Sequence, residues 1–126
     1  MSQRTPLARV RGLGSAKGGT DHFWMQRVSA VANVFLVGFL IWLVFALAGA
    51  DYATVKRALA RPEIAIPLLL LVVSSVVHMR LGMQTIIEDY VHSEGRKVAL
   101  LMLNSFFAFV VGVTCVFAVL KLSFGA

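Results

Sequence analysis

Charged residues and cysteine are scarce in this sequence. Only 14% of its 126 residues are charged, whereas 59% are hydrophobic, and the mean hydropathy is +0.83. Soluble domains are about one quarter charged, so the composition excludes an ordinary soluble domain. A single cysteine, Cys115, excludes a disulfide framework.

A cleavable targeting segment is also lacking. The first 27 residues contain no continuous apolar stretch followed by a small-residue cleavage site, which a signal peptide requires. The Arg- and Ser-rich amphipathic pattern of a mitochondrial leader is missing too, although Arg4, Arg9 and Arg11 lie in this part. We therefore expect a protein of the bacterial inner membrane.

Three apolar runs are present, and each approaches the roughly 20 residues that a helix needs to cross a bilayer. These runs comprise residues 28–48, 64–87 and 98–120. They predict an all-α membrane protein with three transmembrane helices. Residues 21–126 are expected to form the membrane domain, and residues 1–20 an irregular tail on the cytoplasmic side.

Two local patterns refine this expectation. Thr20 and Asp21 are residue types that cap helix N-termini, so the first long helix is expected to begin beside them. In the first loop, Tyr52, Val55 and Leu59 follow one another at spacings of three and four residues. This spacing predicts a short amphipathic helix.

The net charge of +6 does not indicate nucleic-acid binding, because the basic residues flank the apolar runs and form no solvated face. Such flanking charge belongs to membrane orientation, since cytoplasmic loops are enriched in Lys and Arg. With a cytoplasmic N-terminus, the inner side receives Arg4, Arg9, Arg11, Lys17, Arg27, Arg80, Arg96 and Lys97, and the outer side Lys56, Arg57, Arg61 and Lys121. Eight inner against four outer cations predict a cytoplasmic N-terminus and a periplasmic C-terminus.

His78 stands inside the second apolar run. It lies ten residues before Glu88, or roughly 15 Å from that boundary, and ionisable groups at this depth are usually functional. Three roles are open: a packing histidine, part of a proton relay, or an axial haem ligand. Gly82 follows one turn later, where a missing side chain lets a flat macrocycle approach. A bis-histidine haem needs its second ligand from another chain, which makes this protein one component of a larger assembly.

Other polar residues admit a structural and a functional interpretation. Asp89 and Tyr90 suit hydrogen bonding and proton supply to a quinone, or simply a helix end with an interfacial aromatic residue. Arg27 suits positive-inside anchoring or an anion such as a haem propionate. Arg80 points roughly opposite to His78, where it either snorkels to the interface or meets a partner.

Two patterns resemble signatures of the hydrophobic membrane anchor subunits of succinate dehydrogenase, respiratory complex II. They are His78-x3-Gly82-Met83-x5-Asp89-Tyr90-Val91 and Gly19-Thr20-Asp21-His22-Phe23-x3-Arg27-x2-Ala30. The likeness covers about residues 14–120 and the three-helix plan. Some members have His before Asp ahead of the Phe, whereas Asp21 precedes His22 here. Arg80 occupies a position expected to be apolar or aromatic.

The resemblance implies specific roles. His78 is expected to be one axial ligand of haem b and its iron, with a histidine of the cytochrome b556 subunit as the other. Gly82 gives the macrocycle room, and Arg27 lies near the haem propionates or the quinone. Tyr90 hydrogen-bonds ubiquinone, with Asp89 supporting it. The chain performs no chemistry alone: a flavoprotein subunit oxidises succinate in the tricarboxylic acid cycle, and an iron–sulfur subunit passes electrons into the respiratory chain.

Two alternatives remain. The anchor of a fumarate reductase has the same architecture with electrons flowing in reverse. A non-enzymatic small membrane protein, such as part of a proton-coupled transporter, needs a polar path through the spans. Apart from His78, Arg80 and scattered Ser, Asn and Thr, the spans hold no such path.

Overall fold

The computed structural model describes residues 5–12 and 18–125, and within them every regular element is a helix. The helices in chain order are α1 (Pro6–Val10), α2 (Gly19–Ala46), α3 (Tyr52–Leu59), α4 (Pro62–Tyr90) and α5 (Glu94–Phe124). Helices α2, α4 and α5 are long and apolar enough to cross a membrane. The predicted all-α fold with three long apolar helices is therefore confirmed.

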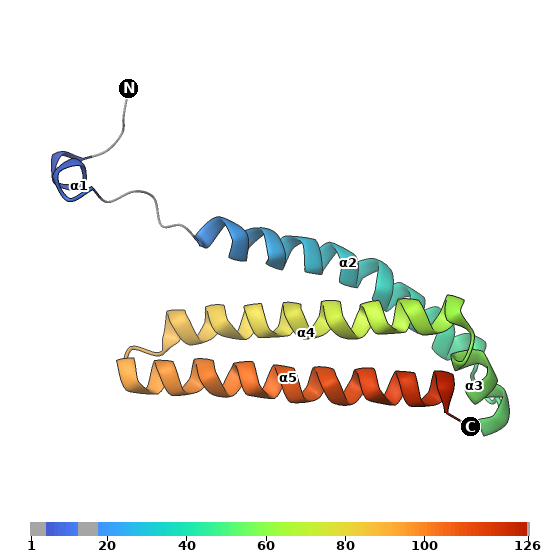
Figure 1. The fold of residues 1–126 in the computed structure, drawn as a ribbon. Coiled ribbons are helices and arrows are strands. Elements are labelled where there is room, and N and C mark those ends of the chain that lie inside the picture. Colours follow the sequence, from blue (N-terminus) through green and yellow to red (C-terminus); the bar gives the residue numbers. More distant parts are fainter. Residues whose placement is uncertain (1–4, 13–17, 126) are drawn as a thin grey trace.

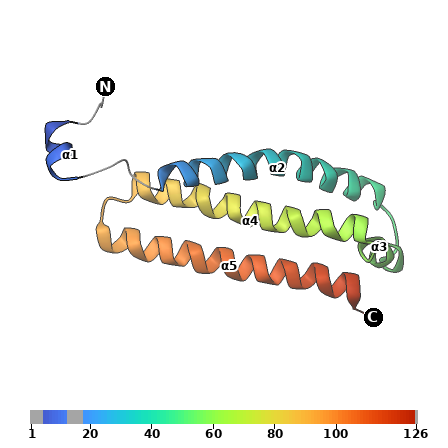
Figure 2. The same ribbon diagram turned by 45° about the horizontal axis from the view of Figure 1, so that its top comes forward.

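Helix α4 lies in the middle of the molecule. It packs along α2 on one side and along α5 on the other, whereas the described residues of α2 and α5 do not pack against each other. Consecutive long helices run in opposite directions, as Figures 1 and 2 show. The start of α2 and the α4–α5 turn consequently lie at one end of the molecule. The short helix α3 and the C-terminus lie at the other end.

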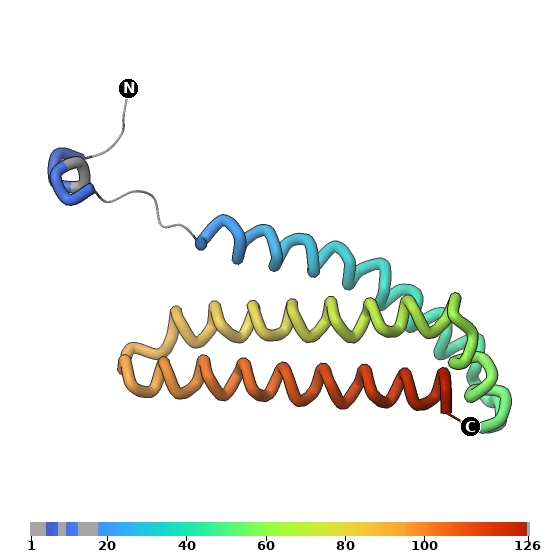
Figure 3. The backbone as a smooth tube through the Cα atoms, in the orientation of Figure 1, coloured from blue at the N-terminus to red at the C-terminus, as the bar shows by residue number. Residues whose placement is uncertain are grey.

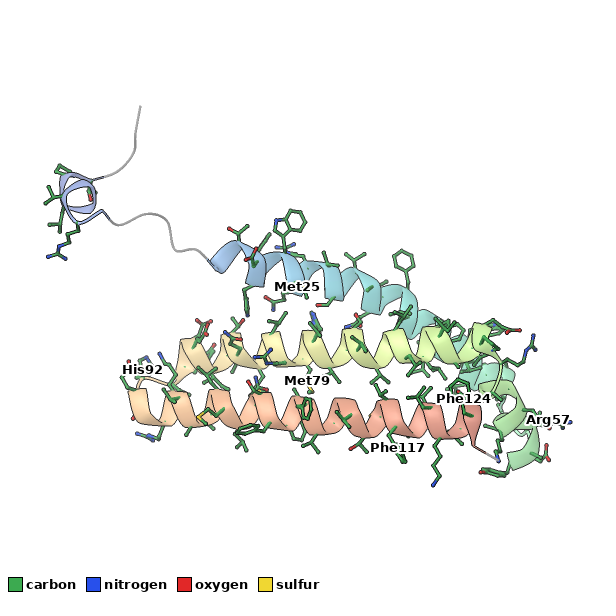
Figure 4. All side chains as sticks on the ribbon, in the orientation of Figure 1. Met25, Arg57, Met79, His92, Phe117 and Phe124 are labelled. Carbon is green, nitrogen blue, oxygen red and sulfur yellow. The ribbon has the colours of Figure 1, made fainter. Side chains whose placement is uncertain are left out.

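The side-chain view marks these two ends. Figure 4 shows His92 at the α4–α5 turn, and Arg57 and Phe124 at the opposite end. Near the latter end, α3 packs against α4 and α5, and the hydroxyl of Ser123 donates a hydrogen bond to the carbonyl of Leu59 at 3.0 Å. This small helix therefore closes one end of the α4–α5 pair.

Local sequence explains where α3 and α4 begin. Asp51 caps α3 by accepting a hydrogen bond from the backbone N–H of Thr54 at 3.3 Å. Helix α3 contains Tyr52, Val55 and Leu59, so the short amphipathic helix predicted from their spacing is confirmed. Pro62 occupies the first turn of α4, where a helix has no internal partner for its N–H. Pro67 lies inside α4, where the helix loses one backbone hydrogen bond.

The long helices extend beyond the predicted apolar runs at almost every boundary. Their extra residues include most of the charged residues next to the apolar runs, because backbone hydrogen bonding continues past the point where hydropathy falls. The predicted N-cap of α2 is wrong: Gly18 is the cap and makes no side-chain hydrogen bond. Thr20 and Asp21 lie inside the first turn, which the tube in Figure 3 shows as the blue start of the long helix.

The tail, residues 1–20, is not wholly irregular, since α1 is helical. Two of the inner cations, Arg4 and Lys17, lie outside the described residues, as does the side chain of Arg9. The predicted irregular structure is thus wrong for α1 and for the start of α2.

The interior of this chain is small. Its buried hydrophobic residues are Leu43, Ile64, Ala65, Leu71, Ile87 and Ala108. Two polar residues, Ser29 and Asn104, are buried with exposed fractions of 6% and 8%. Large apolar side chains cover the outside of all three long helices (Figure 4). Such a surface suits contact with lipid and with partner helices. Because few apolar side chains are buried, polar contacts contribute much of the packing between the helices.

Candidate functional site

A polar seam joins α2 to α4. We define the α2–α4 seam as Ser29 and Asn33 of α2 with Ser74, Ser75 and His78 of α4. The Ser29 hydroxyl lies 3.1 Å from Nδ1 of His78. Ser74 donates to the carbonyl of Ser29 at 3.3 Å, and Ser75 donates to Oδ1 of Asn33 at 3.4 Å. Hydrogen bonds between small polar residues are a recurrent means of pairing helices in lipid, so this seam fixes α2 against α4.

His78 uses only one of its ring nitrogens in this seam. The residue is half-buried, and Nδ1 faces Ser29. Within the described residues, the one buried side-chain nitrogen or oxygen without a partner is Nε2 of His22. Nε2 of His78 has no hydrogen bond there either and is not among the buried atoms, so it keeps some access to the surface of the chain. A histidine held through one nitrogen and free at the other has the form of a metal ligand.

Gly82 lies one turn beyond His78 and is not packed against another helix. A Cβ added to it meets no atom within 4 Å, whereas one added to Gly112 lies 3.4 Å from Cγ1 of Val76. Gly112 is thus the glycine at which α4 and α5 approach closely. The His78–Gly82 stretch leaves open space at the surface, and the role predicted for Gly82 stays a prediction.

The opposite side of α4 carries Arg80. Its Nε donates to the hydroxyl of Ser105 at 3.3 Å, and its backbone carbonyl accepts a hydrogen bond from Nδ2 of Asn104 at 3.0 Å. Arg80 is two positions after His78, which corresponds to about 160° around the helix. Helix α4 therefore presents its histidine to α2 and its arginine to α5, which gives Arg80 a contact on the α5 side.

A groove of about 890 Å³ runs along this second face. Its walls are apolar side chains of α4 and α5, with Met25 of α2, and its polar lining residues are Arg80 and Ser105. Nothing in the sequence pattern singled out Ser29, Asn104 or Ser105 as the partners of His78 and Arg80. Their one available signal was that each is a polar residue in or beside an apolar run.

Asp89 and Tyr90 lie at the end of α4. Both are exposed, Tyr90 at 77%, and neither makes a side-chain hydrogen bond within the described residues. Tyr90 lines a hollow of about 300 Å³ at the α4–α5 turn, together with His92 and Arg96. Asp89 is on nearly the same face as His78 but about 16 Å further along the helix. Helix α4 therefore carries two separate groups of candidate residues: His78 in its middle, and Asp89 with Tyr90 at its end.

Arg27 does not join the α2–α4 seam. It is exposed, and its guanidinium carbon lies 4.8 Å above the ring of Phe23. It is two positions before Ser29, which places it about 160° around α2 from that residue. Near the start of α2, Asp21 is exposed and His22 is half-buried. The structure brings together His78 and Ser29, but not His78 and Arg27.

Comparison with known proteins decides the family. A sequence model described as succinate dehydrogenase/fumarate reductase transmembrane subunit matches residues 1–113. The chain belongs to this family. Several relatives of this chain are named succinate dehydrogenase hydrophobic membrane anchor subunit. The relative from Rickettsia bellii is 32% identical over 116 residues, which cover 92% of this chain and 93% of that protein.

Two further relatives agree. The Paracoccus denitrificans protein is 32% identical over 122 residues, 97% of this chain and 94% of its own length. The Rickettsia conorii protein is 28% identical over 116 residues, 91% of this chain and 92% of its own. No solved structure matches the chain significantly. The resemblance seen in the sequence is thereby confirmed: the chain is a multi-pass membrane anchor subunit of the succinate dehydrogenase/fumarate reductase family.

Proposed function

We propose that this chain anchors a succinate dehydrogenase in the bacterial inner membrane and contributes to a haem b site and a ubiquinone-reduction site. The family description covers both succinate dehydrogenases and fumarate reductases. The relatives described above are all named as succinate dehydrogenase subunits, which favours succinate oxidation over the fumarate reductase alternative. A transporter role has no comparable support.

The open Nε2 of His78 is the observation that carries the haem proposal. The ring lies inside the apolar part of α4, its Nδ1 is engaged by Ser29, and its Nε2 has no hydrogen bond within the described residues. Gly82, one turn further on, has free space around it. These residues fit a haem ligand: Nε2 of His78 would hold the iron, and Gly82 would leave room for the macrocycle. The bound haem supplies a site that accepts and returns one electron.

A second axial ligand has to come from another subunit. The described residues hold no cluster of three or more His, Cys, Asp or Glu, and no second histidine among them lies beside His78. The resemblance names the cytochrome b556 subunit as the source of the other histidine. Arg27 is proposed as a propionate partner, since it is an exposed cation near the start of α2.

Tyr90 and Asp89 are proposed for the quinone. Their side chains are exposed and make no hydrogen bond within the described residues, so both are free for a ligand. The Tyr90 phenol donates a hydrogen bond to a quinone carbonyl oxygen. The Asp89 carboxylate supports the phenol and takes part in proton delivery from the aqueous side. The iron–sulfur and flavoprotein subunits then dock at this end of the molecule, where electrons reach the quinone.

The orientation follows from charge. The three long helices place the start of α2 and the α4–α5 turn at one end, and α3 and the end of α5 at the other. We assign the first end to the cytoplasm because Arg96 and Lys97 follow the turn there and the basic tail precedes α2. The C-terminus is then periplasmic.

A spectrum of the assembled complex tests the haem assignment. In membranes carrying the whole complex, we expect His78→Ala to abolish the haem b band of the reduced-minus-oxidised difference spectrum. The matched control is His92→Ala, an exposed histidine at the α4–α5 turn, which should keep the band. Equal amounts of membrane-bound flavoprotein in both variants verify assembly. An undiminished haem b band in His78→Ala would overturn the ligand assignment.

A further inference from the structure

Among the described residues, Ser29 is the one whose side chain touches the imidazole of His78 by a hydrogen bond. Its hydroxyl lies 3.1 Å from Nδ1 and also 3.1 Å from the backbone carbonyl of Gln26 on its own helix. Only 6% of Ser29 is exposed. Water therefore has little access to this hydroxyl, and its two contacts define its hydrogen bonding.

The number of protons decides the direction of these bonds. A serine hydroxyl has one proton to donate and two lone pairs to accept with. The Gln26 carbonyl can only accept, so the Ser29 proton is directed to it. The remaining contact is then Nδ1–H donating to the Ser29 oxygen. In this arrangement His78 is the tautomer whose proton is on Nδ1 and whose lone pair is on Nε2.

We infer that Ser29 is a positioning residue for the haem ligand: it holds His78 in the tautomer and ring orientation that direct the Nε2 lone pair out of the chain. This inference rests on the proposed function of His78. The helix of Ser29 is held in turn, because Ser74 of α4 donates to the Ser29 carbonyl at 3.3 Å. The hydroxyl and the ring are thus fixed by the same two helices.

The contact affects the iron as well as the ring. A hydrogen bond from Nδ1–H to an acceptor raises the basicity of the ligating nitrogen, and loss of such a partner typically weakens metal binding roughly 10- to 100-fold. A more basic ligand stabilises the ferric state over the ferrous state. Removal of the Ser29 hydroxyl should therefore weaken haem retention and shift the haem midpoint potential to a more positive value.

The test compares variants of the whole complex in membranes. Ser29→Ala should raise the haem b midpoint potential in a redox titration and change the electron paramagnetic resonance signal of the ferric haem, because the ring is free to rotate. Ser29→Thr keeps a hydroxyl and should restore both. The matched control is Ser75→Ala, which removes another α2–α4 hydrogen bond, at 3.4 Å, without touching His78; it should leave potential and signal as in the wild type.

Each result has a defined meaning. A wild-type potential and signal in Ser29→Ala would overturn the inference, and so would a shift of equal size in Ser75→Ala. If Ser29→Ala does not assemble, Ser29→Cys replaces it, since sulfur is a weak acceptor of nearly the same shape; a wild-type potential there also overturns the inference. Loss of haem in His78→Ala with an unaffected Ser29→Ala removes this inference alone. Retention of haem in His78→Ala removes the proposed ligand role of His78, on which this inference rests.

Discussion

The substitution Tyr90→Phe separates the quinone role from structural roles of this residue. Tyr90 is 77% exposed, and its phenol has no hydrogen-bond partner within the described residues. Removal of the hydroxyl therefore leaves no donor or acceptor of this chain unpaired. A surface change of this kind alters the free energy of unfolding by less than about 0.5 kcal/mol, so assembly of the complex and its haem should be unaffected.

The effect on quinone reduction follows from the one hydrogen bond that is lost. A neutral hydrogen bond contributes about 0.5–1.5 kcal/mol, which corresponds to a rate roughly 2- to 13-fold lower. If negative charge develops on the quinone oxygen during reduction, the decrease in rate caused by losing this donor rises toward about 100-fold. We expect succinate–ubiquinone reductase activity to fall within these limits, while succinate oxidation with an artificial dye as acceptor stays at the wild-type rate.

Tyr52→Phe is a matched control, because Tyr52 is the only other tyrosine and is 73% exposed. It lies in α3 at the opposite end of the molecule. It should leave both activities unchanged. Equal ubiquinone reduction by the Tyr90→Phe and Tyr52→Phe complexes would refute the reasoning. Equal loss of dye-linked activity in Tyr90→Phe would instead indicate a docking defect of the soluble subunits.

Three further predictions concern packing and orientation. At Gly112, where an added Cβ lies 3.4 Å from Val76, alanine should be tolerated, whereas leucine should separate α4 from α5, measured as a loss of cross-linking between the two helices. Asn104→Ala removes a hydrogen bond to a carbonyl of α4 and should lower the free energy of unfolding in mixed micelles by about 0.6–1.7 kcal/mol; an unchanged value contradicts a stabilising role. The orientation is tested with an impermeant maleimide after replacement of the native cysteine. A cysteine at Ser93 should react only in inverted vesicles washed free of the soluble subunits. A cysteine at Ala53 should react only in spheroplasts. The reverse pattern rules out a cytoplasmic N-terminus.

The number and order of the membrane helices followed from hydropathy, since a bilayer demands long uninterrupted apolar segments. The helix boundaries did not follow from hydropathy, because a helix continues into polar residues wherever its backbone hydrogen bonds persist. The start of α2 shows this, with Gly18 as its cap and with Thr20 and Asp21 inside the helix. Capping preferences alone favoured the wrong residue.

The candidate site divides in the same way. His78, Gly82, Asp89 and Tyr90 are recognisable because polar groups and a glycine at helical spacing are costly or unusual in an apolar run. The partners of these groups were not recognisable. Ser29 is 49 residues from His78, and no spacing rule relates positions on two helices whose rotation and axial offset are unknown.

Hydropathy and residue type were enough to predict a three-helix membrane protein in which one helix carries an ionisable residue at depth. The position of α4 between the other two long helices, with His78 toward α2 and Arg80 toward α5, became visible in the packed molecule. The physical reason is that lipid is as apolar as leucine, so a spanning helix is hydrophobic all round and has no apolar stripe that marks its packing face. The choice of faces depends on a few polar contacts and on Gly112, which are distant in the sequence and meet only when the helices are packed.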